Sequence, residues 1–535
     1  MQDYRDVLAS NTVQEMRTMV NDNFNTIRST HAGEAFPTEN LVLGMKCFRT
    51  DEKKTYTLVS MDPLEWAVEA SGGDIVNAQK YLAFIGREAL GRLTDWSGLF
   101  NRALSVEVVD FADLGTGAYV TNMSKMFHDC VSLKTVLNLN LPSSHVVRDV
   151  HGMFSECTAI SVLDVTGFQA KNVESFVDMF SDCHELKKLD VSGWQTGNAT
   201  DMRGMFRNCW KLESLDVSKW NVSKCTDFAE MFAGCRRLRG LDFTTWDTAK
   251  ATAMGGMFQG CGNENVPFAP LKLDLTTLDA SNVETTAKMF AYARAELIIG
   301  EKMRKTGKCT HMEGMFSRFN NLGDVVIAGD GYNPAVMATD YHGTPCKQTI
   351  FTAFDYSSVE NMSGMFEGTY AVNCEIDGKK GLVFHVSTPN VTNVSRLFSS
   401  TYGAQFMDVS INTDKITEMQ WMFDGANPAS IRLRNFDTRN FDTRKMTVGW
   451  GEVIPVDGMF KSCRNLRYLI IDDTTFKFKL LKDVLADLPA ECRFVVPRAM
   501  IPVYKEQEHW KNYASRLIAM EDCSLYGACV NSAPA

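Results

Sequence analysis

The stretch DMRGMFRNCWKLESLDVSKW, residues 201–220, recurs along the chain with small changes. The segment before it reads VDMFSDCHELKKLDVSGW, and the segment after it reads AEMFAGCRRLRGLDFTTW. The phenylalanine of the Met-Phe pair recurs at steps of 27, 26, 26, 26 and 26 residues, at Phe127, Phe154, Phe180, Phe206, Phe232 and Phe258. A fixed period in the twenties is the signature of a solenoid, in which each repeat forms one coil.

The repeat extends to both sides of these regular copies. Phe100 lies 27 residues before Phe127, so we expect a degenerate first coil that starts near residue 92. Later copies have irregular steps of 32, 26, 50, 32, 25 and 37 residues, at Phe290, Phe316, Phe366, Phe398, Phe423 and Phe460. Insertions in solenoids form loops on one face, which is often the binding face.

One copy of the repeat predicts the structure of a coil. Residues 202–209 place Met, Met, Phe and Cys at i, i+3, i+4 and i+7, the spacing of a buried stripe on a short helix. An Asn or Thr usually precedes the stripe and is expected to cap its first free amides. Residues 212–217 then have the spacing of a short strand. We therefore predict an α/β repeat, a leucine-rich-repeat-like solenoid whose coils of 26 residues each contain a short helix and a short parallel strand.

Cysteines occupy one position in successive copies. They are Cys130, Cys157, Cys183, Cys209, Cys235 and Cys261, with Cys463 in a later copy. Metal binding and disulfide bonding are the alternatives to a packing role, but the paired C-x-x-C spacing of zinc sites does not occur. We expect reduced thiols that fill the seam between coils, with no bound metal or other cofactor.

Two further ladders follow from the stacking. The first is formed by Asp164, Asp190, Asp216 and Asp242, and the second by Trp194, Trp220 and Trp246. We expect the carboxylates to accept turn hydrogen bonds, with a calcium ladder as the alternative. We expect the indoles to pack at the ends of the strands, with a platform for stacking sugars as the alternative.

Composition excludes several classes of function. The chain has 535 residues, a net charge of −10 and 45% hydrophobic residues. The acidic balance argues against a nucleic-acid partner, because phosphate binding needs a basic surface. No run of apolar residues is long enough to insert into a membrane. The first residues, MQDYRDVLASNTVQEM, lack the basic and apolar regions of a signal peptide, so we expect none.

The repeat resembles a known family. Its pattern N-V-x-x-M-x-x-M-F-x-x-C-x-x-L-x-x-L-D-V-S-x-W-x-T is similar to the BspA-like, mycoplasma-lipoprotein-type leucine-rich repeat of bacterial surface proteins. The similarity covers residues 92–475, and the segment CRFVVPRAMIPVYKEQEHWKNYASRLIAMED resembles the closing segment of those proteins. In that segment we expect a last strand at 495–497 and a helix at 499–519 that covers the end of the stack. Members of the family typically act as adhesins or surface recognition modules.

The N-terminal residues 12–28, TVQEMRTMVNDNFNTIR, have apolar residues at steps of 3, 4, 4 and 3. This stripe consists of Val13, Met16, Val20, Phe24 and Ile27. Two structures have such a pattern: an amphipathic helix packed on its own domain, and a short trimeric coiled coil. The stripe is therefore our candidate for oligomerisation.

The residues after this helix predict a β-hairpin. Phe48 on one side and Tyr56, Leu58 and Met61 on the other bracket the turn RTDEKK. The wider pattern resembles the N-terminal segment of many bacteriophage fibre proteins. The matching residues are Asn23, Phe24, Pro37, Gly44, Phe48, Thr50, Tyr56 and Trp66, with Phe48 in place of the usual Trp. This resemblance implies a segment that joins the fibre to the virion, usually as a trimer.

Together, the two resemblances imply a phage structural protein that is made in the host cytoplasm and located in the virion. We expect residues 1–90 to be a small α+β attachment domain, residues 91–475 the solenoid and residues 476–535 a helical cap. The expected function is a head or tail fibre, a homotrimer that contacts other virion proteins through its attachment domain and a host cell-surface glycan or protein through the solenoid. The distribution of the repeat points to a phage of Bacteroidales, such as a crAss-like phage.

Candidate receptor-binding residues lie in two insertions. The segment AGDGYNPAVMATDYHGTPC, residues 328–346, contains Tyr332, Tyr341 and His342. The segment RNFDTRNFDTRKMTVGW, residues 434–450, contains Trp450 and several arginines. Aromatic rings in exposed loops stack on sugars, and plain connecting loops are the alternative.

Three other functions stay open. A bacterial surface or injection-machine adhesin of the BspA-like family would use the same solenoid. A fibre-borne glycan depolymerase would need paired carboxylates in a cleft, and the sequence offers no pair or nucleophile motif that the repeat does not explain. We therefore expect a protein that is not an enzyme. A head-decorating or purely structural role would share the same fold.

Overall fold

The structure is a computed structural model. It describes most of the chain from residue 94 onward, in the ranges 94–104, 106–111, 120–139, 146–168, 170–263, 271–319, 353–370, 372, 379–434, 436–439, 458–479, 484–485 and 487–522. It also describes the backbone of short strands at 31–33, 46–49, 54–61, 64–68, 326–327, 338–339, 345–346, 374–376, 446–448 and 451–453.

The chain divides into two compact units, Met1–Trp246 and Asp247–Ala535. Both are built from stacked coils, and the fold is a parallel β-solenoid of about 13 turns with few helices. The predicted solenoid architecture is therefore confirmed. In the described residues, no helix is long and apolar enough to cross a membrane.

The predicted helix in each coil is wrong. Residues 203–208 form consecutive turns instead, and we call the equivalent six residues of every coil its turn segment. Within the segment, alternate amides bond three residues back, as from Arg207 N to Gly204 O at 2.9 Å. The amides between them donate to the next coil, as from Phe206 N to Met231 O at 2.9 Å. In an α-helix these amides would donate to carbonyls four residues back in the same coil. Because they donate to the next coil instead, no helix forms here.

The second and sixth residues of the turn segments adopt a left-handed backbone. Gly204 and Asn208 have φ values of 61° and 58°, and the equivalent positions of other coils have similar values. Glycine adopts this conformation without strain, and Asn or Asp adopts it at a small cost. The Asn or Asp before the turn segment accepts an amide two residues on, as Asp201 does from Arg203 at 2.9 Å. The prediction that Asn or Thr caps a helix is therefore wrong, because the helix does not form and these side chains close a turn instead.

The core of both units is a ladder of phenylalanine rings. Phe206 stacks on Phe180 at 5.6 Å and on Phe232 at 5.8 Å, and all three rings are buried. Phe100 stacks on Phe127 at 5.2 Å, so the degenerate first coil exists. The ladder continues through the second unit from Phe258 to Phe460, including the irregular copies. Coil insertions therefore leave the core intact.

The strands of the first unit are short. Its N-terminal sheet has the order β1-β2-β3-β4, with bounds β1 His31–Gly33, β2 Lys46–Arg49, β3 Lys54–Met61 and β4 Leu64–Val68. The antiparallel pair β2–β3 confirms the predicted hairpin. The coils contribute parallel strands of two or three residues, β5 Val108–Asp110, β6 Thr135–Leu137, β7 Val162–Leu163, β8 Lys188–Leu189 and β9 Gly240–Leu241.

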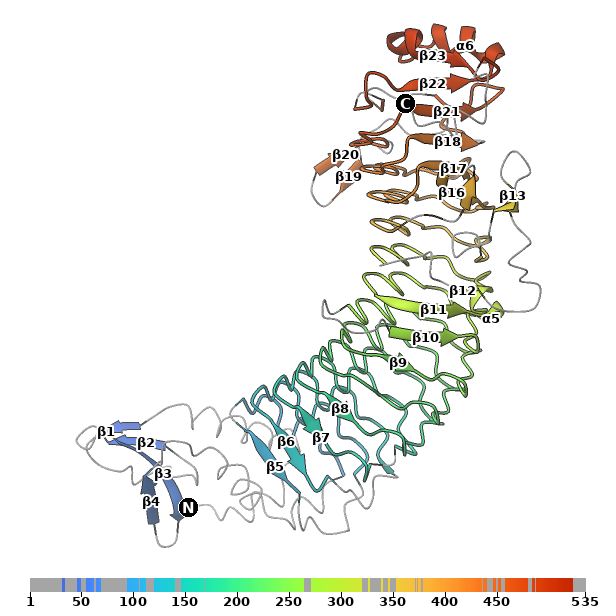
Figure 1. Cartoon of the computed structure of the whole chain (residues 1–535). Coiled ribbons are helices and arrows are strands. Elements are labelled where there is room, and N and C mark those ends of the chain that lie inside the picture. Colours follow the sequence, from blue (N-terminus) through green and yellow to red (C-terminus); the bar gives the residue numbers. More distant parts are fainter. Residues whose placement is uncertain are drawn as a thin grey trace. The chain divides into compact units, whose positions relative to one another are not determined.

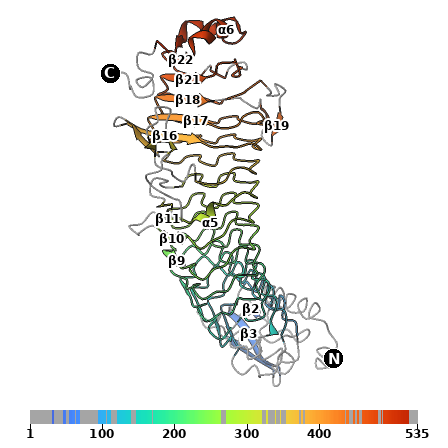
Figure 2. The same ribbon diagram turned by 90° about the vertical axis from the view of Figure 1, so that its right-hand side faces the viewer.

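The second unit has longer parallel strands, which lie one above another in both views (Figures 1 and 2). Its first strands are β10 Leu271–Leu275, β11 Ala295–Ile299 and β12 Val326–Ile327, with the short helix α5 Glu301–Arg304 after β11. A seven-stranded sheet then contains β15 Cys374–Ile376, β16 Lys379–His385, β17 Phe406–Ser410, β18 Ser430–Arg434, β21 Tyr468–Asp472, β22 Arg493–Val496 and β23 Leu517–Ala519. Two antiparallel pairs, β13 Ala338–Thr339 with β14 Pro345–Cys346 and β19 Met446–Val448 with β20 Gly451–Val453, belong to the insertions.

The C-terminal segment differs from the single helix predicted at 499–519. It contains η3 Arg498–Met500, α6 Ile501–Glu506, η4 Lys511–Arg516 and strand β23. The predicted last strand exists as β22, but β23 pairs with it in parallel and extends the sheet by one strand. Trp510 is fully buried against Tyr504 at 4.7 Å and Phe494 at 5.5 Å. Packing of these rings, which sequence periodicity does not reveal, interrupts the helix.

The cysteine ladder is a packing feature, as predicted. All seven of its thiols are buried. Six of them donate to the carbonyl of the Phe in the preceding coil at 3.0–3.2 Å, as from Cys209 Sγ to Phe180 O at 3.2 Å. Burial raises the pKa of Cys130 and of Cys235 to about 12.

We expect these thiols to be inert in the native protein, because the thiolate is the reactive form of cysteine. Iodoacetamide at neutral pH should leave Cys130, Cys209 and Cys235 unmodified, whereas the same treatment in urea should modify all three. Peptide mass spectrometry measures the modification site by site. Rapid labelling of the native ladder would contradict its burial.

The aspartate ladder forms turns, as expected. Asp216 Oδ1 accepts from Ser218 N at 3.1 Å and from Ser218 Oγ at 2.6 Å. The same contacts recur at Asp164 and Asp190, and Asp242 accepts from the amide of Thr244 at 2.9 Å. These hydrogen bonds, from the side chain first and then from the backbone, lower the pKa of Asp216.

We expect Asp216→Ala to destabilise the first unit by about 0.5–1.5 kcal/mol, the net value of such hydrogen bonds. Asp216→Asn is the matched control and should lose less, because its carbonyl oxygen still accepts from the turn. Urea unfolding measures both changes. A rise in the wild-type melting temperature with calcium that Asp216→Ala abolishes would favour the calcium ladder instead.

The tryptophan ladder is buried. Trp220 stacks on Trp194 at 6.2 Å and on Trp246 at 6.4 Å. Each indole N–H donates to a valine carbonyl in the preceding coil at 3.1–3.4 Å. The three rings are at most 3% exposed, so the packing prediction is confirmed and the sugar platform on these residues is wrong.

Candidate functional site

A groove of about 590 Å³ runs along the turn segments of six successive coils in the second unit. Its lining begins at Gln259 and ends at Trp421. Every lining residue comes from the first, second, fifth or sixth position of a turn segment, because the central Met and Phe point into the core. Stacking of coils therefore brings residues far apart in sequence into one line, and the volume is that of a typical ligand site.

Small residues make the groove hollow. Ala291, Gly314, Ser317, Gly364 and Ser395 lie among its lining residues. These small residues leave space between the larger lining side chains, such as those of Lys288, Glu313 and Trp421. The groove is therefore a consequence of side-chain size at variable positions, with the backbone repeat unchanged.

In the first unit, the coils of Phe180, Phe206 and Phe232 carry long, paired side chains at some of the equivalent positions. Arg207 contacts Asp178 at 3.3 Å and Glu230 at 3.1 Å, which joins three consecutive coils. Asn208 donates to Asp182 at 2.8 Å on the same face. These polar contacts link the described coils of the first unit to one another, which is a structural role.

Two aromatic side chains mark the groove. Tyr292 is 45% exposed, and the guanidinium of Arg318 lies 5.5 Å from its ring centre. Trp421 has the guanidinium of Arg396 at 5.0 Å from its ring centre. A Cβ on Gly458 would lie 2.6 Å from the Trp421 ring, so glycine is needed in the following coil for the indole to fit.

Both aromatic residues sit where the backbone disfavours them. Tyr292 has a φ of 59° and Trp421 a φ of 55°, at positions that other coils often fill with Gly, Asp or Asn. A bulky residue with this conformation is uncommon and costs on the order of 1 kcal/mol or more. Glu156 and Arg318 hold the equivalent position in other coils with φ values of 63° and 53°. The feature that distinguishes Tyr292 is therefore its half-exposed aromatic ring, which core packing does not explain.

The groove also contains unpaired acceptors. Glu313 Oε2 and Gln420 Oε1 are buried, and neither has a hydrogen-bond partner among the described residues. Gln420 as a whole is 6% exposed. A buried acceptor without a partner costs about 1–3 kcal/mol, and a ligand that carries hydroxyl or amide donors removes that cost.

The structure does not test the sequence-predicted sites. Tyr332, Tyr341, His342 and Trp450 lie outside the described residues, and so does the oligomerisation stripe at 13–27. Sequence reasoning missed the groove itself. The available signal was the appearance of Tyr292 and Trp421 at turn positions where one neighbouring copy has glycine, Gly260 in the first case and Gly458 in the second.

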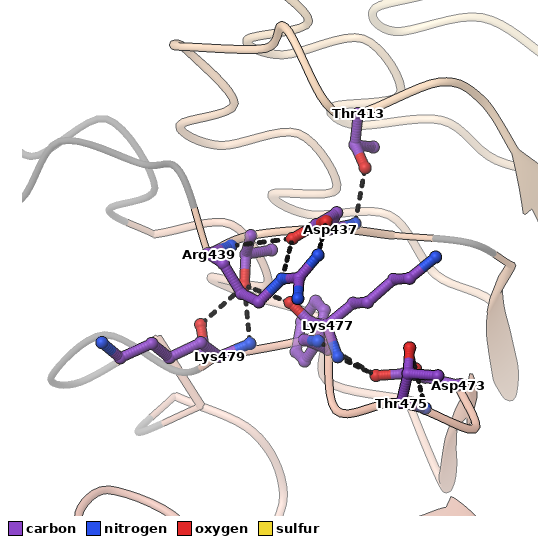
Figure 3. Close-up of polar contacts among 9 residues, drawn as sticks. Thr413, Asp437, Arg439, Asp473, Thr475, Lys477 and Lys479 are labelled. Atoms are coloured by element: carbon purple, nitrogen blue, oxygen red, sulfur yellow. Dashed lines mark hydrogen bonds and ion pairs between the residues drawn. The ribbon is translucent and has the colours of Figure 1, made fainter.

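The two described arginines of the segment 434–450 pair with carboxylates of the solenoid. Arg434 binds Asp408 through two contacts of 2.7 Å. Arg439 binds Asp437 with contacts of 2.6 and 2.9 Å, and Asp437 N donates to Thr413 in the preceding coil (Figure 3). The network continues through Thr438 to Lys477 and Lys479 and through Asp473 to Thr475 and Lys477. These contacts join residues 436–439 to the preceding coil and to the coil that follows.

These features define the class of the protein: a β-solenoid built from Met-Phe repeats, with a surface groove across its coils. The family described as Mycoplasma protein of unknown function, DUF285, matches residues 94–215, 148–269, 200–328 and 336–450. The chain belongs to this family, because the matches cover more than half of its length. The predicted BspA-like, mycoplasma-lipoprotein-type repeat is thereby confirmed.

Other comparisons add a distant likeness. Among curated proteins, no relative matches the sequence. A solved structure, a leucine rich cell surface protein from Faecalibacterium prausnitzii A2-165, matches with 12% identity over 82% of this chain and 86% of that chain, with a TM-score of 0.25. The family matches begin at residue 94, so the resemblance of residues 1–90 to phage fibre proteins stays a prediction.

Proposed function

We propose that this protein is a virion fibre that attaches to the particle through residues 1–90 and presents its solenoid for recognition of a host surface. The groove over six coils is the observation that carries the recognition role. Support for the virion setting comes from the N-terminal sequence pattern and from the hairpin β2–β3 within it. Trimerisation through the stripe at 13–27 belongs to the same proposal.

The second candidate is a bacterial surface adhesin. Membership of the DUF285 family favours it, because repeats of the BspA-like type are typical of adhesins. The same groove would then act from a cell surface. The two candidates differ in the surface that carries the protein, and they share the solenoid and its ligand.

Location separates these candidates. An antibody against residues 94–522 and gold labelling in electron microscopy should decorate purified phage particles from a producing culture. Particles assembled with a chain that lacks residues 1–90 should be unlabelled, while the truncated chain stays in the soluble fraction. Label on bacterial envelopes, with bare particles, would contradict the fibre proposal and favour the adhesin.

We also propose that the protein is not an enzyme. The groove does contain two carboxylates, Glu313 and Glu367, on neighbouring coils. A depolymerase would use such a pair as acid and as base or nucleophile. Prolonged incubation with host-surface polysaccharide should leave its chain length unchanged by size-exclusion chromatography. Shortening that Glu313→Gln abolishes would replace this proposal with the depolymerase.

A further inference from the structure

We propose that the groove binds a neutral oligosaccharide lengthwise, across several coils. The proposal rests on the recognition function proposed above and names its ligand class. Neighbouring coils lie 5.4–6.1 Å apart at their Phe rings, so the lining presents similar positions at regular intervals. A chain molecule with its own repeat, rather than a single compact ligand, suits such a surface.

The aromatic rings supply the apolar part of the site. Tyr292 and Trp421 have left-handed backbones at the sixth and the second position of their turn segments. Other coils of the groove have glycine at these positions, the sixth in Gly260 and Gly368 and the second in Gly314 and Gly364. Aromatic faces are the side chains that cover the C–H faces of sugars. The two rings come from the coils of Phe290 and Phe423, so they mark points near opposite ends of the groove.

The polar part of the site offers acceptors and hydroxyls in a row. Glu313, Ser363, Ser395 and Gln420 occupy the first position of four consecutive turn segments, and all four line the groove. Glu313 and Gln420 each have a buried oxygen without a partner among the described residues. Sugar hydroxyls donate and accept hydrogen bonds, so they match a row that contains unpaired acceptors.

The charge of the lining favours a neutral ligand. Four ionisable side chains line the groove, the cationic Lys288 and Arg396 and the anionic Glu313 and Glu367. Two charges of each sign cancel, whereas sites for polyanions or polycations carry an excess of the opposite charge. Acidic polysaccharides and basic peptides are therefore disfavoured.

The backbone disfavours a peptide that would bind as an added strand. That mode needs a row of free amides and carbonyls at a sheet edge. In the floor of the groove, Gly314 N donates to Ser363 O at 2.8 Å, and Gly364 N donates to Ser395 O at 2.8 Å. These backbone amides and carbonyls already bond to the neighbouring coil, so a ligand in the groove would contact side chains.

The decisive variant is Tyr292→Gly, which removes the ring and relieves the left-handed strain at one position. The full chain is first screened for binding to an array of neutral oligosaccharides. Its affinity for the oligosaccharide that binds best is then measured by calorimetry. We expect Tyr292→Gly to weaken that binding at least tenfold, while its melting temperature stays equal or rises, since glycine accepts this φ without cost. Trp421→Gly should also weaken binding at least tenfold.

Glu156→Gly is the matched control for Tyr292→Gly, because Glu156 has a φ of 63° at the sixth position of a turn segment in the first unit. Lys125→Gly is the matched control for Trp421→Gly, because Lys125 has a φ of 54° at the second position. Both controls change the backbone in the same way outside the groove, and their affinities should equal that of the wild type. The proposal fails if no neutral oligosaccharide binds, if sialylated or sulfated oligosaccharides or arrayed peptides bind better, or if Tyr292→Gly keeps full affinity. Gold labelling of particles is independent of these results, so the fibre proposal can stand when this one fails.

Discussion

Replacing Phe206 with alanine should destabilise the first unit by about 3–5 kcal/mol, the cost of removing a buried Phe side chain. The ring has no exposed surface and stacks on Phe180 and Phe232 at 5.6 and 5.8 Å. It also lies 6.4 Å from the Trp220 ring. Alanine leaves a cavity between three coils, and the repeat prevents local collapse because each coil is held by both neighbours.

Urea unfolding followed by circular dichroism measures the loss, and hydrogen exchange maps it along the stack. Protection should fall most in the coils of Phe180 and Phe232 and less in coils further away. Tyr402→Ala is the control, because Tyr402 is 49% exposed and should lose far less. A loss below about 1 kcal/mol for Phe206→Ala would show that the ladder is not the core.

The second large effect is expected at Asp408. Its carboxylate is 2% exposed and receives two contacts of 2.7 Å from Arg434 and one of 3.0 Å from His385. Asp408 lies on strand β17, with His385 on β16 and Arg434 on β18, and both partners reach it diagonally from positions that pair with Ser410. Asp408→Asn removes the carboxylate charge but leaves the guanidinium of Arg434 partly buried. We therefore expect the free energy of unfolding to fall by about 3–5 kcal/mol. Asp414→Asn, at an exposed position, is the matched control.

The same carboxylate should make stability depend on pH. Burial alone raises the pKa of Asp408, but hydrogen bonds and charge from Arg434 and His385 outweigh burial and lower it below its ordinary value. A lowered native pKa stabilises the fold above the unfolded value of about 3.9 and loses that effect as pH falls through the native pKa. The stability gap between the wild type and Asp408→Asn should therefore narrow below about pH 4. Equal gaps at neutral and acidic pH in urea unfolding would contradict this assignment.

Much of the candidate site was beyond prediction from one sequence. The insertions at 328–346 and 434–450 attracted attention because loops carry function in solenoids. The groove instead uses ordinary turn positions of copies whose spacing ranges from 25 to 50 residues. Because the spacing is irregular, the sequence alone does not show that Gln259 and Trp421 lie along one face. It also does not show which glutamates have a hydrogen-bond partner and which, such as Glu313, have an oxygen without one among the described residues.

The sequence by itself determined the solenoid, its period and the residues inside it. Met, Phe, Cys and Trp recur at fixed steps, and burial of apolar side chains requires recurring positions to face the same core. The tertiary structure alone decided between a helix and consecutive turns at residues 203–208, because apolar spacing suits both. Hydrogen bonds to the next coil settled that choice. They also aligned Tyr292, Gln420 and Trp421 on one surface, since stacking, and not proximity in the chain, decides which side chains share a site.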